Sequence, residues 1–352
     1  MDLNPEIWKG KKVLITGHTG FKGTWLSFLL RHLGAELTGV SLPDVDNYIF
    51  YKESNAKANF KSEKFIDISD QKSIEFFINH TEFDYVFHLA AQSLVGESIL
   101  NPLETFTTNI SGTANVLLSS LNSKKIQGII VVTSDKVYEN TETEKPFLES
   151  DRLGGDDPYS ASKAAVEILT RALSLSNNPN HIPIATVRAG NVIGGGDWAR
   201  ERIIPDVVRS IVEKRTLTIR FPGATRPWQH VLDCLSGYLL VAENHIKKIS
   251  TPNTLNFGPH TSLSVSELVE KFVQSFEFKP RIVLEKFNKH EKKYLKVNSD
   301  LARLNLGWNP KLNTDQAIYM TAKWYLDYLE GIPTNQLVVD DIIQYLGGMN
   351  EL

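Results

Sequence analysis

A tyrosine, a lysine and a polar group after an apolar segment are the residues of this sequence whose spacing suggests chemistry. The apolar run Ile129 to Val132 stops at Thr133-Ser134-Asp135-Lys136, as expected for a buried parallel strand with reactive groups at its carboxyl end. Tyr159 and Lys163 lie four positions apart, which on a helix places both side chains on one face. A cation there lowers the pKa of the phenol and makes it a general base for an alcohol proton. Chance also produces such pairs on surface helices, so the order of motifs along the chain must support this interpretation.

The elements that would position these residues begin near the amino terminus. The short apolar segment Val13 to Ile15 precedes a helical pattern that ends at Leu33, and the turn between them is rich in glycine. Strand, glycine-rich turn and helix form the setting of a dinucleotide-binding loop, because glycines let the backbone approach a pyrophosphate and the helix amino terminus stabilises its charge. An ordinary strand-to-helix turn is the alternative. The sequence predicts cofactor contacts from Gly17, Gly20, Phe21 and Gly23.

The second predicted strand, Glu36 to Leu42, indicates NAD as the cofactor. It ends near Asp44, about twenty residues beyond the glycines, where an acidic side chain can accept hydrogen bonds from the adenosine ribose. No Lys or Arg lies between Ser41 and Tyr51 to pair with a 2′-phosphate. The sequence therefore favours NAD over NADP, while the alternative for Asp44 is a solvated loop residue.

Alternating strand and helix patterns predict the fold class. Tyr85 to Ser93 contains a buried strand with His88 as a core residue, and its small end, Ala90-Ala91, would let a flat cofactor pack against backbone. Ile182 to Ala189 supplies a further strand. Such units require a doubly wound, mainly parallel α/β sheet of the Rossmann type, followed by a smaller mixed C-terminal substrate lobe.

One long helix is predicted from Asn101 to Leu121. Asn101 is a plausible N-cap, Pro102 occupies the first helical position, and apolar residues follow at helical spacing. This helix is expected to lie beside the helix that carries Tyr159.

Composition and charge exclude several classes of partner. The chain has 352 residues, with 38 basic and 41 acidic side chains and a pI near 6.3, which leaves no electrostatic footprint for nucleic acid or an anionic membrane. The single cysteine, Cys234, excludes an internal disulfide framework and is expected to be buried. The sequence has no run of about 18 apolar residues and no signal-peptide pattern, so we expect a cytoplasmic protein without membrane partners.

The composition changes after Ala189, which predicts two parts. Residues 1–190 would form the NAD-binding domain and residues 191–352 mainly the substrate lobe, with about 231–256 returning to the first part. Basic and aromatic residues recur in the second part, and guanidinium groups recognise a diphosphate bidentately. The alternative is ordinary surface charge. The residues predicted to hold a nucleotide diphosphate, in the cleft outside the carboxyl ends of the strands, are Asn191, Arg202, Arg220, Arg226, His230 and Tyr294.

Four motifs carry a resemblance to a known family. They are Thr16-Gly-x-x-Gly-x-x-Gly, Tyr159-x-x-x-Lys163, Arg188-Ala-Gly-Asn191 and Arg226-Pro-Trp-Gln-His230. Together they resemble the nucleotide-sugar 4,6-dehydratases of the extended short-chain dehydrogenase/reductase superfamily, from Lys11 to about Leu329. Most members have Asp-Glu where this chain has Asp135-Lys136, whereas Asp-Lys followed by Tyr-Glu-Asn is typical of the branch that acts on CDP-glucose. Val137 departs from that branch, in which Cys is expected.

The resemblance implies a reaction. Tyr159 would take the C4 hydroxyl proton while hydride leaves C4 to NAD+, and Ser134 would hydrogen-bond the C4 oxygen. The 4-keto group would acidify C5, and Asp135 would protonate the leaving C6 hydroxyl, which requires a raised pKa. Lys136 stands where the family's glutamate is the C5 base and would have to be neutral to act so; the alternative is a charged Lys136 that positions the sugar or stabilises the enolate. Hydride would return to C6, giving CDP-4-keto-6-deoxyglucose and water.

The resemblance also implies partners and further contacts. The two helices that contain Asn101 to Leu121 and Tyr159 form a dimer contact in such proteins, which implies a homodimer or a dimer of dimers. The product would serve deoxysugar biosynthesis, such as that of lipopolysaccharide O-antigen, and no metal is expected. Phe65 to Ile68 resembles the short strand that borders the adenine. Besides the glycine-rich turn, the implied cofactor contacts are Asp44, Asp67, Ile68, Leu89, Ala90, Ala91, Thr108, Tyr159 and Lys163.

Two other functions stay open. The first is a dehydratase or epimerase that acts on a UDP-, dTDP- or GDP-linked sugar; an epimerase needs only Tyr159 and Lys163 and would not require Asp135-Lys136. The second is a protein that senses NAD or a nucleotide sugar without turning it over. Such a protein would have no need of a general base.

Overall fold

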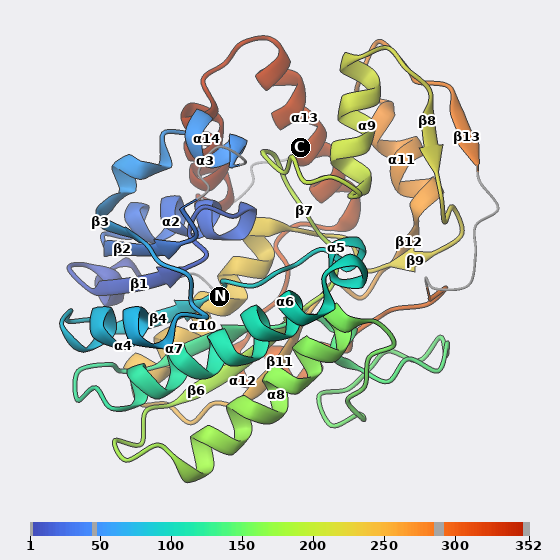
Figure 1. The fold of residues 1–352 in the computed structure, drawn as a ribbon. Coiled ribbons are helices and arrows are strands. Elements are labelled where there is room, and N and C mark those ends of the chain that lie inside the picture. The colour runs from blue at the N-terminus through green and yellow to red at the C-terminus, as the bar shows by residue number, and fades with distance from the viewer. Residues whose placement is uncertain (1–2, 44–47, 285–291, 348–352) are drawn as a thin grey trace.

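A central sheet of seven strands organises the protein, which a computed structural model describes for residues 3–43, 48–284 and 292–347. The strand order is β11-β6-β5-β4-β1-β2-β3, and every neighbouring pair is parallel (Figure 1). This arrangement confirms the predicted doubly wound, Rossmann-type sheet. The strands are β1 (Lys12–Thr16), β2 (Glu36–Ser41), β3 (Phe60–Phe65), β4 (Tyr85–His88), β5 (Ile129–Val132), β6 (Ile184–Ala189) and β11 (Thr254–Phe257).

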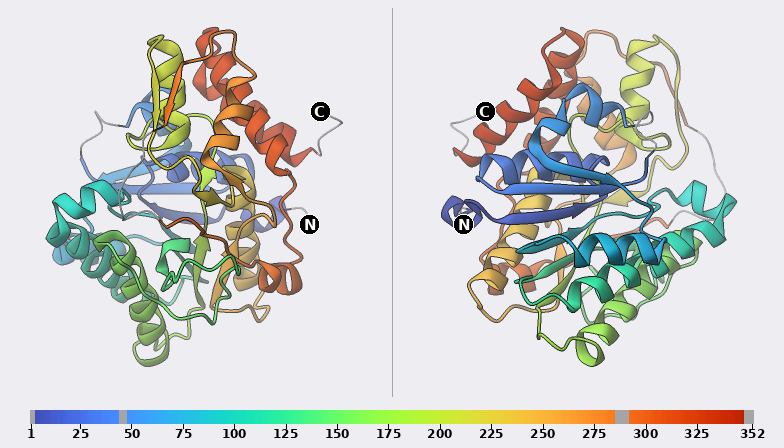
Figure 2. Two further views of the ribbon diagram at one scale, coloured as in Figure 1. Left: turned by 90° about the vertical axis from the view of Figure 1, so that its right-hand side faces the viewer. Right: turned by 60° about the vertical axis from the view of Figure 1, so that its left-hand side comes forward.

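Alternation along each strand sends side chains to two separate hydrophobic cores. In β5, Ile129 and Val131 belong to one core and Ile130 and Val132 to the other. The first core is covered by α4 (Gln71–Asn79), α7 (Gly112–Leu121) and α8 (Pro158–Ser176), and the second by α2 (Phe21–His32), α10 (Val231–Ile246) and α14 (Thr334–Leu346). Figure 2 shows α4, α7 and α8 on one side of the sheet and α2 and α14 on the other. Burial on both faces explains why the inner strands are continuous apolar runs.

A smaller lobe follows β6, at the right of Figure 1. Its first strand, β7 (Val192–Ile193), pairs with β10 (Gln229–His230), so the chain leaves the sheet directly beyond the carboxyl end of β6 and later returns through α10 and β11. The lobe is mixed, as predicted, because β13 pairs with β8 in parallel and β12 with β9 antiparallel. Its other elements are α9 (Ile203–Val212), β8 (Leu217–Ile219), β9 (Thr225–Arg226), β12 (Leu263–Ser264), α11 (Val265–Val273), β13 (Ile282–Leu284) and α13 (Thr314–Leu329). The helix α12 (Asp300–Leu306) instead packs against β11 and α10 at the central sheet.

The prediction of one regular helix from Asn101 to Leu121 is wrong in its middle. Between α6 (Pro102–Phe106) and α7, a π-helical segment spans Thr107–Ser111. Asn109 holds this wider turn, because its amide donates to the Gln92 carbonyl at 3.0 Å and to Ser162 Oγ of α8 at 2.8 Å. Asn101 also fails to cap the helix with its side chain, which donates instead to Glu97 of α5 (Val95–Leu100). The predicted contact with the Tyr159 helix is confirmed, since α6 and α7 both pack on α8.

The third strand lies earlier than predicted. It spans Phe60–Phe65 rather than Phe65 to Ile68, because it is an edge strand with charged, largely exposed side chains and lacks the apolar run of the inner strands. Asp67 follows it in a turn and accepts a hydrogen bond from the Ser69 amide at 2.8 Å. Asp44 lies outside the described residues.

Two predictions about single residues are confirmed. Cys234 is fully buried. His88 is a core residue whose ring nitrogens bond Thr16 Oγ1 at 2.7 Å and Thr113 Oγ1 at 2.9 Å. Among the described helices, none is long and apolar enough to cross a membrane. The remaining short helices are α1 (Pro5–Trp8), α3 (Ile49–Glu53) and the 3-10 turns Ala56–Asn59 and Asp135–Val137.

Candidate active site

The polar group after β5 forms a tight turn. Ser134 caps the 3-10 turn Asp135–Val137, since its Oγ accepts a hydrogen bond from the Lys136 amide at 3.1 Å. The same hydroxyl donates to Asp135 Oδ1 at 3.1 Å. Ser134 and Asp135 are both buried. The turn therefore presents a hydroxyl and a carboxyl group in a desolvated position at the carboxyl end of the sheet.

Helix α8 brings the predicted base to this turn. Asp157 caps α8 through the Ser160 amide at 2.9 Å, and Pro158 occupies the first helical position, so Tyr159 lies in the first turn. The Ser134 hydroxyl lies close enough to the Tyr159 phenol to act on its pKa. One turn further on, Lys163 Nζ donates to the Val132 carbonyl of β5 at 3.1 Å. The structure thus gathers Ser134, Tyr159 and Lys163 at one strand end.

The expected depression of the Tyr159 pKa is absent in the protein alone. Burial dominates and raises the pKa of Tyr159 to about 12, although the hydrogen bond with Ser134 and the charge of Arg202 act in the opposite direction. Lys163 directs its ammonium to the Val132 carbonyl rather than to the phenol. Burial, together with the charge of Lys22, also lowers the pKa of Lys163 to about 8.

Asp135 has the property that an acid in this position requires. Burial raises its pKa, against the charges of Lys136 and Arg226 and the hydrogen bond from Ser134. Its Oδ2 atom has no hydrogen-bond partner among the described residues. A carboxyl group held in this way tends to keep its proton and can donate it.

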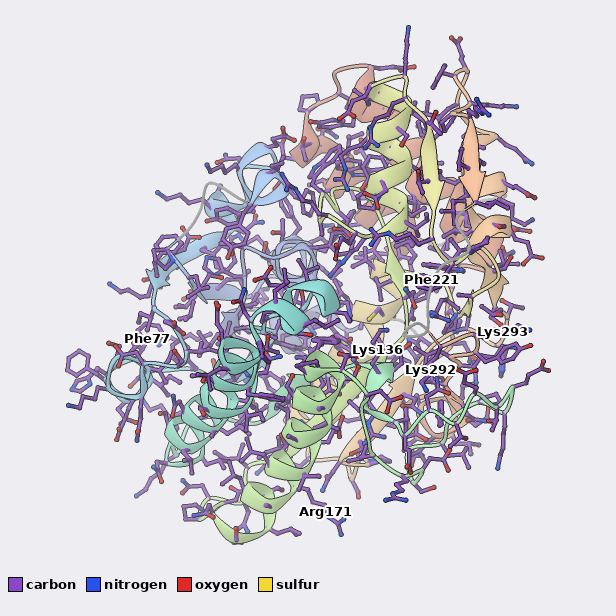
Figure 3. All side chains as sticks on the ribbon, turned by 45° about the vertical axis from the view of Figure 1, so that its right-hand side comes forward. Phe77, Lys136, Arg171, Phe221, Lys292 and Lys293 are labelled. Atoms are coloured by element: carbon purple, nitrogen blue, oxygen red, sulfur yellow. The ribbon has the colours of Figure 1, made fainter. Side chains whose placement is uncertain are left out.

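Lys136 is half-buried and follows Asp135 on the same turn. In the part of the chain that the structure describes, its ammonium forms no hydrogen bond or ion pair with a side chain, although its charge acts on Asp135. In Figure 3, Lys136 lies near the middle of the view, with the labels of Phe221 and Lys292 beside it, and Arg171 lies toward the lower end of α8.

The glycine-rich turn between β1 and α2 fits a dinucleotide. Gly17 has a φ of +75° and a Cβ there would lie 2.7 Å from the Ala90 amide nitrogen; a Cβ on Gly23 would lie 2.2 Å from the Gly17 carbonyl oxygen. Backbone packing this close needs glycine, and no side chain at the N-cap, Gly20, caps the first N–H groups of α2. Lys22, in the first turn of α2, adds a cation that the sequence reasoning missed.

The other predicted cofactor residues are spread along the same edge of the sheet. Leu89, Ala90 and Ala91 follow β4 and are half-buried, and Phe21 and Thr108 are half-buried at the starts of α2 and of the π-helical segment. Ile68 is buried, and a Cβ on Gly112 would meet its side chain. Asp67 is exposed and bonded to its own turn, so no contact of this structure brings it to the other predicted residues.

Two of the predicted cations lie close to the candidate catalytic residues. Arg202 pairs with Asp197 at 3.0 Å, and its charge acts on Tyr159. Arg226 is buried, donates to the carbonyl oxygens of Thr225 at 2.8 Å and Lys292 at 2.9 Å, and acts on Asp135. Arg226 therefore lies beside the proposed acid rather than on an open surface.

The other predicted substrate residues are less closely associated with this group. Arg220 is exposed and pairs with Glu201 at 3.9 Å. His230 is fully buried, caps α10 through the Leu232 amide at 3.3 Å, and packs edge-on against Trp25, and burial lowers its pKa to about 3. Its position inside the protein gives no support to a role in substrate contact.

Asn191 and Tyr294 are half-buried residues at the border of the smaller lobe. The Asn191 carbonyl accepts from the Gln229 amide at 3.1 Å, and the Tyr294 carbonyl accepts from Asn140 Nδ2 at 2.8 Å. Both therefore hold neighbouring segments through their backbones. The Tyr294 ring lies under the Lys293 ammonium, 4.8 Å from the ring centroid, and the carbonyl of the nearby Lys292 accepts a hydrogen bond from Arg226.

Sequence reasoning missed a buried ion pair behind the site. Glu167 lies one turn beyond Lys163 on α8, and Arg188 lies on β6; Arg188 Nε and Glu167 Oε1 are 2.9 Å apart. The i, i+4 spacing from Lys163 was the only signal in the sequence that could have identified Glu167.

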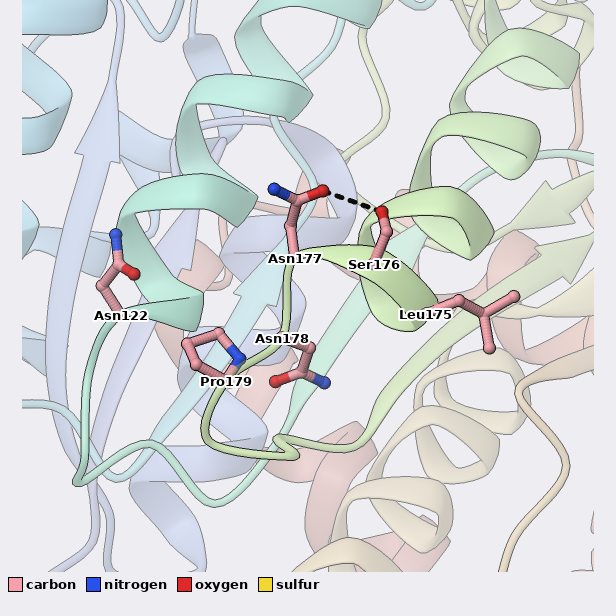
Figure 4. A pocket seen from close by; sticks show the side chains of 6 residues that line it. All are labelled: Asn122, Leu175, Ser176, Asn177, Asn178 and Pro179. Carbon is pink, nitrogen blue, oxygen red and sulfur yellow. Dashed lines mark hydrogen bonds between the residues drawn. The ribbon is translucent and has the colours of Figure 1, made fainter.

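A surface hollow of about 340 Å³ lies elsewhere. Figure 4 shows it at the ends of α7 and α8, where Asn122, Leu175, Ser176, Asn177, Asn178 and Pro179 line it. None of the predicted site residues is among them. No group of three or more His, Cys, Asp or Glu side chains within the described ranges could hold a metal ion.

Comparison with solved structures identifies the same fold in nucleotide-sugar enzymes. A UDP-glucose-4-epimerase from Stenotrophomonas maltophila superposes with a TM-score of 0.79 at 23% identity, over 92% of this chain and 100% of that one. A dTDP-glucose 4,6-dehydratase from Streptomyces venezuelae superposes with a TM-score of 0.76 at 22% identity, over 90% and 97%. At these identities the likeness is one of fold.

Sequence comparison identifies the family. The CDP-glucose 4,6-dehydratase of Salmonella typhimurium is 37% identical over 342 residues, which are 94% of each chain, and the human dTDP-D-glucose 4,6-dehydratase is 26% identical over 324 residues, which are 90% of each. The family model described as GDP-mannose 4,6 dehydratase matches residues 14–321. The chain therefore belongs to this family of nucleotide-sugar 4,6-dehydratases.

Proposed function

We propose that the protein is an NAD-dependent dehydratase that converts CDP-glucose to CDP-4-keto-6-deoxyglucose and water. The similarity to the Salmonella enzyme over 94% of both chains supports the substrate. The glycine-rich turn, with its tight packing at Gly17 and Gly23, supports a dinucleotide cofactor. Residues 1–190 would bind NAD and residues 191–352 mainly the nucleotide sugar.

The placement of Asp135 is the observation that carries this proposal. An epimerase needs only the oxidation and reduction at C4, for which Tyr159 and Lys163 suffice. Asp135 is buried, has a raised pKa and accepts a hydrogen bond from Ser134, whose hydroxyl acts on the pKa of Tyr159. A protonated carboxyl group at this point has a purpose in a reaction that expels a hydroxyl group, because it can protonate the leaving oxygen.

The residues divide the reaction between them. NAD+, when bound, accepts hydride from C4 of the sugar and later returns it to C6. Tyr159 would take the C4 hydroxyl proton as a phenolate, which the charges of Lys163 and of the bound nicotinamide would stabilise against the effect of burial, and Ser134 would hold the C4 oxygen. Asp135 gives its proton to the C6 hydroxyl as C5 loses its own. The proton at C5 would go to Lys136, whose amine must be neutral for this step, and would return to C5 as hydride adds to C6. A charged Lys136 would instead stabilise the enolate and would leave the removal of the C5 proton to another base.

Arg202 is the proposed contact for the diphosphate. The Arg202 side chain is 38% exposed, its guanidinium is fixed by Asp197, and its charge acts on Tyr159. Asn191 and Tyr294 would line the same cleft. Arg226, bonded to backbone carbonyls beside Asp135, would act on the sugar end rather than on an exposed phosphate.

Incubation with a panel of nucleotide sugars tests the function. Purified protein, with and without added NAD+, is offered CDP-glucose, dTDP-glucose, UDP-glucose and GDP-mannose, and product mass is followed. Loss of one water from CDP-glucose is the expected result. Loss from a different nucleotide sugar would keep the dehydration and overturn the substrate, whereas an isomer of unchanged mass would make the protein an epimerase.

We also propose a homodimer formed through α6 and α8. Leu103 of α6 is 78% exposed, and Ile168 and Leu175 of α8 are 61% and 76% exposed, while the two helices pack side by side. Exposed apolar side chains on adjacent helices are typical of an interface.

The variant Ile168→Glu tests this interface and should yield monomers in light scattering. The matched control is Leu304→Glu, at an 84% exposed leucine on α12, which should leave the oligomer intact. An unchanged oligomer in both variants would place the interface elsewhere. A cytoplasmic location remains a prediction, which cell fractionation can test. A role in O-antigen synthesis also remains a prediction, which depends on how the product is used further.

A further inference from the structure

The buried pair of Glu167 and Arg188 is the largest polar feature near the site that the proposed chemistry does not use. The two side chains are 3% and 4% exposed and form two parallel bonds of 2.9 Å. Thr133 Oγ1 donates to Glu167 at 2.5 Å and Thr186 Oγ1 at 2.6 Å, so the carboxylate accepts four hydrogen bonds. Burying two charges costs solvation free energy even when they are paired, so a pair placed here calls for a specific reason.

This pair holds both ends of the catalytic turn. Thr133, bonded to Glu167, directly precedes Ser134, Asp135 and Lys136. On the far side of the turn, the Tyr138 hydroxyl accepts from Arg188 Nη1 at 2.8 Å, and Arg188 lies over the Tyr138 ring at 4.9 Å. The Tyr138 hydroxyl in turn donates to Asn256 Oδ1 of β11 at 2.7 Å.

The pair also connects the turn to the helix of the proposed base. Glu167 lies one helical turn beyond Lys163 on α8. Lys163 donates to the Val132 carbonyl, and Glu167 accepts from Thr133, so two consecutive residues of the strand end are bound by two consecutive turns of α8. The Glu167 carboxylate and the Arg188 guanidinium therefore connect the turn that carries Asp135 to the helix α8 that carries Tyr159 and Lys163.

We propose that Glu167, Arg188 and Tyr138 are positioning residues that hold the Ser134 to Lys136 turn against α8. In this position the acid Asp135 and the base Tyr159 can each reach its own carbon of the sugar. The inference rests on the proposed dehydration. The Tyr138 hydroxyl fixes the end of the turn next to Asp135 and Lys136 through its hydrogen bonds. Loss of this hydroxyl therefore impairs elimination more than oxidation. A pair that served stability alone would slow every step equally or none.

The step-resolved test is Tyr138→Phe. The variant keeps the ring, its stacking on Phe147 with centroids 4.7 Å apart and the contact with Arg188, and loses only the hydroxyl. We expect turnover of CDP-glucose to fall by about 10²-fold, the effect of a misplacement of the order of an ångström, and the steady-state absorbance of reduced nicotinamide to rise. Amide hydrogen exchange of the segment 133–138, measured without cofactor or substrate, should become faster.

Tyr85→Phe is the matched control. Tyr85 is also fully buried, and its hydroxyl bonds His245 Nδ1 at 2.8 Å on the other side of the sheet. This variant should lose a similar amount of thermal stability but leave the nicotinamide absorbance and the exchange of 133–138 unchanged. Equal behaviour of the two variants would overturn the proposal.

Glu167 offers a second, electrostatic readout. Among the described residues, Lys163 interacts electrostatically with Lys22, Glu167 and His88. The Glu167 carboxylate raises the pKa of Lys163, whereas burial and the charge of Lys22 lower it. Glu167→Gln should therefore shift the high-pH decline of the oxidation step to lower pH, and Glu167→Asp, which keeps the charge, should restore the profile. A Gln variant with an unshifted profile would refute the electrostatic part.

The proposed function and this inference fail in different ways. If wild-type protein releases no water from CDP-glucose, the function fails, while the exchange of segment 133–138 in Tyr138→Phe still measures whether the turn is held. If wild-type protein is active and Tyr138→Phe slows oxidation and elimination in the same proportion, the positioning proposal fails alone.

Discussion

Replacing Asp135 by asparagine removes the proposed acid and leaves the shape of the side chain almost unchanged. The carboxyl group is 4% exposed, accepts from Ser134 at 3.1 Å and has a pKa raised by burial. A general acid contributes about 10²- to 10⁴-fold to a rate, so Asp135→Asn should lose turnover of CDP-glucose by about that factor. Oxidation at C4, which depends on Tyr159, should continue, so reduced nicotinamide should accumulate when substrate is added.

The same substitution should raise stability. A carboxyl group whose pKa is raised on folding binds more protons in the native than in the unfolded state between pH 3.8 and its folded pKa, so its ionisation destabilises the protein as pH rises through that window. Asp135→Asn removes this penalty. We expect the melting temperature of the variant to exceed that of the wild type near pH 7, and the difference to disappear below about pH 3.8, the ordinary pKa of an aspartate. Turnover of the wild type should likewise decline as pH rises through the folded pKa.

The assay combines product mass, nicotinamide absorbance and thermal unfolding in the same samples. Asp70→Asn is the control, because Asp70 is an exposed cap of α4 and asparagine also caps helices. An Asp135→Asn enzyme that keeps turnover within about tenfold of wild type, or that loses oxidation and elimination together, would refute the assignment of Asp135 as the acid.

Three further predictions concern single residues. Lys163→Met should lower the rate of C4 oxidation by about 10²-fold or more, and wild-type oxidation should fall as pH rises through about 8, where Lys163 loses its proton, as read by single-turnover kinetics across pH. Lys136→Arg distinguishes base from cation: an arginine cannot deprotonate, so retained dehydration would exclude the C5-base role, whereas loss of dehydration with intact oxidation would support it. Gly17→Ala should weaken NAD+ binding, as measured by calorimetry, and lower the melting temperature, because the added Cβ would meet Ala90. The control is Gly10→Ala, which has a φ of +72° and no atom within 4 Å of the added Cβ. It carries the same backbone strain and should leave the affinity for NAD+ unchanged.

The local features of the site follow from the sequence alone. The four-residue spacing of Tyr159 and Lys163 determines that they share a helical face, since this depends only on the period of the helix. The apolar run before Ser134 and the glycines from Gly17 likewise predict a buried strand end and a dinucleotide loop. These are short-range patterns, and the structure reproduces each of them as a strand, a turn or a helix.

The tertiary structure decided what surrounds these groups. Arg226 and His230 have the residue types of substrate contacts, yet packing buries both, one against backbone carbonyls and the other beside Trp25. The π-helical turn at Thr107–Ser111 depends on the hydrogen bonds from Asn109 to Gln92 and Ser162. These contacts join separate segments, so the local sequence pattern does not predict them.

The pKa values and the ion pair behind the site have the same origin. Tyr159 and Asp135 have raised pKa values because distant segments exclude water from them, and Glu167 meets Arg188 only because α8 lies against β6. Spacing along a helix or strand is a property of the chain itself, so the sequence determined which groups could react. Desolvation and contacts between remote segments exist only after folding, so the tertiary structure decided which of those groups are buried, charged and held in place.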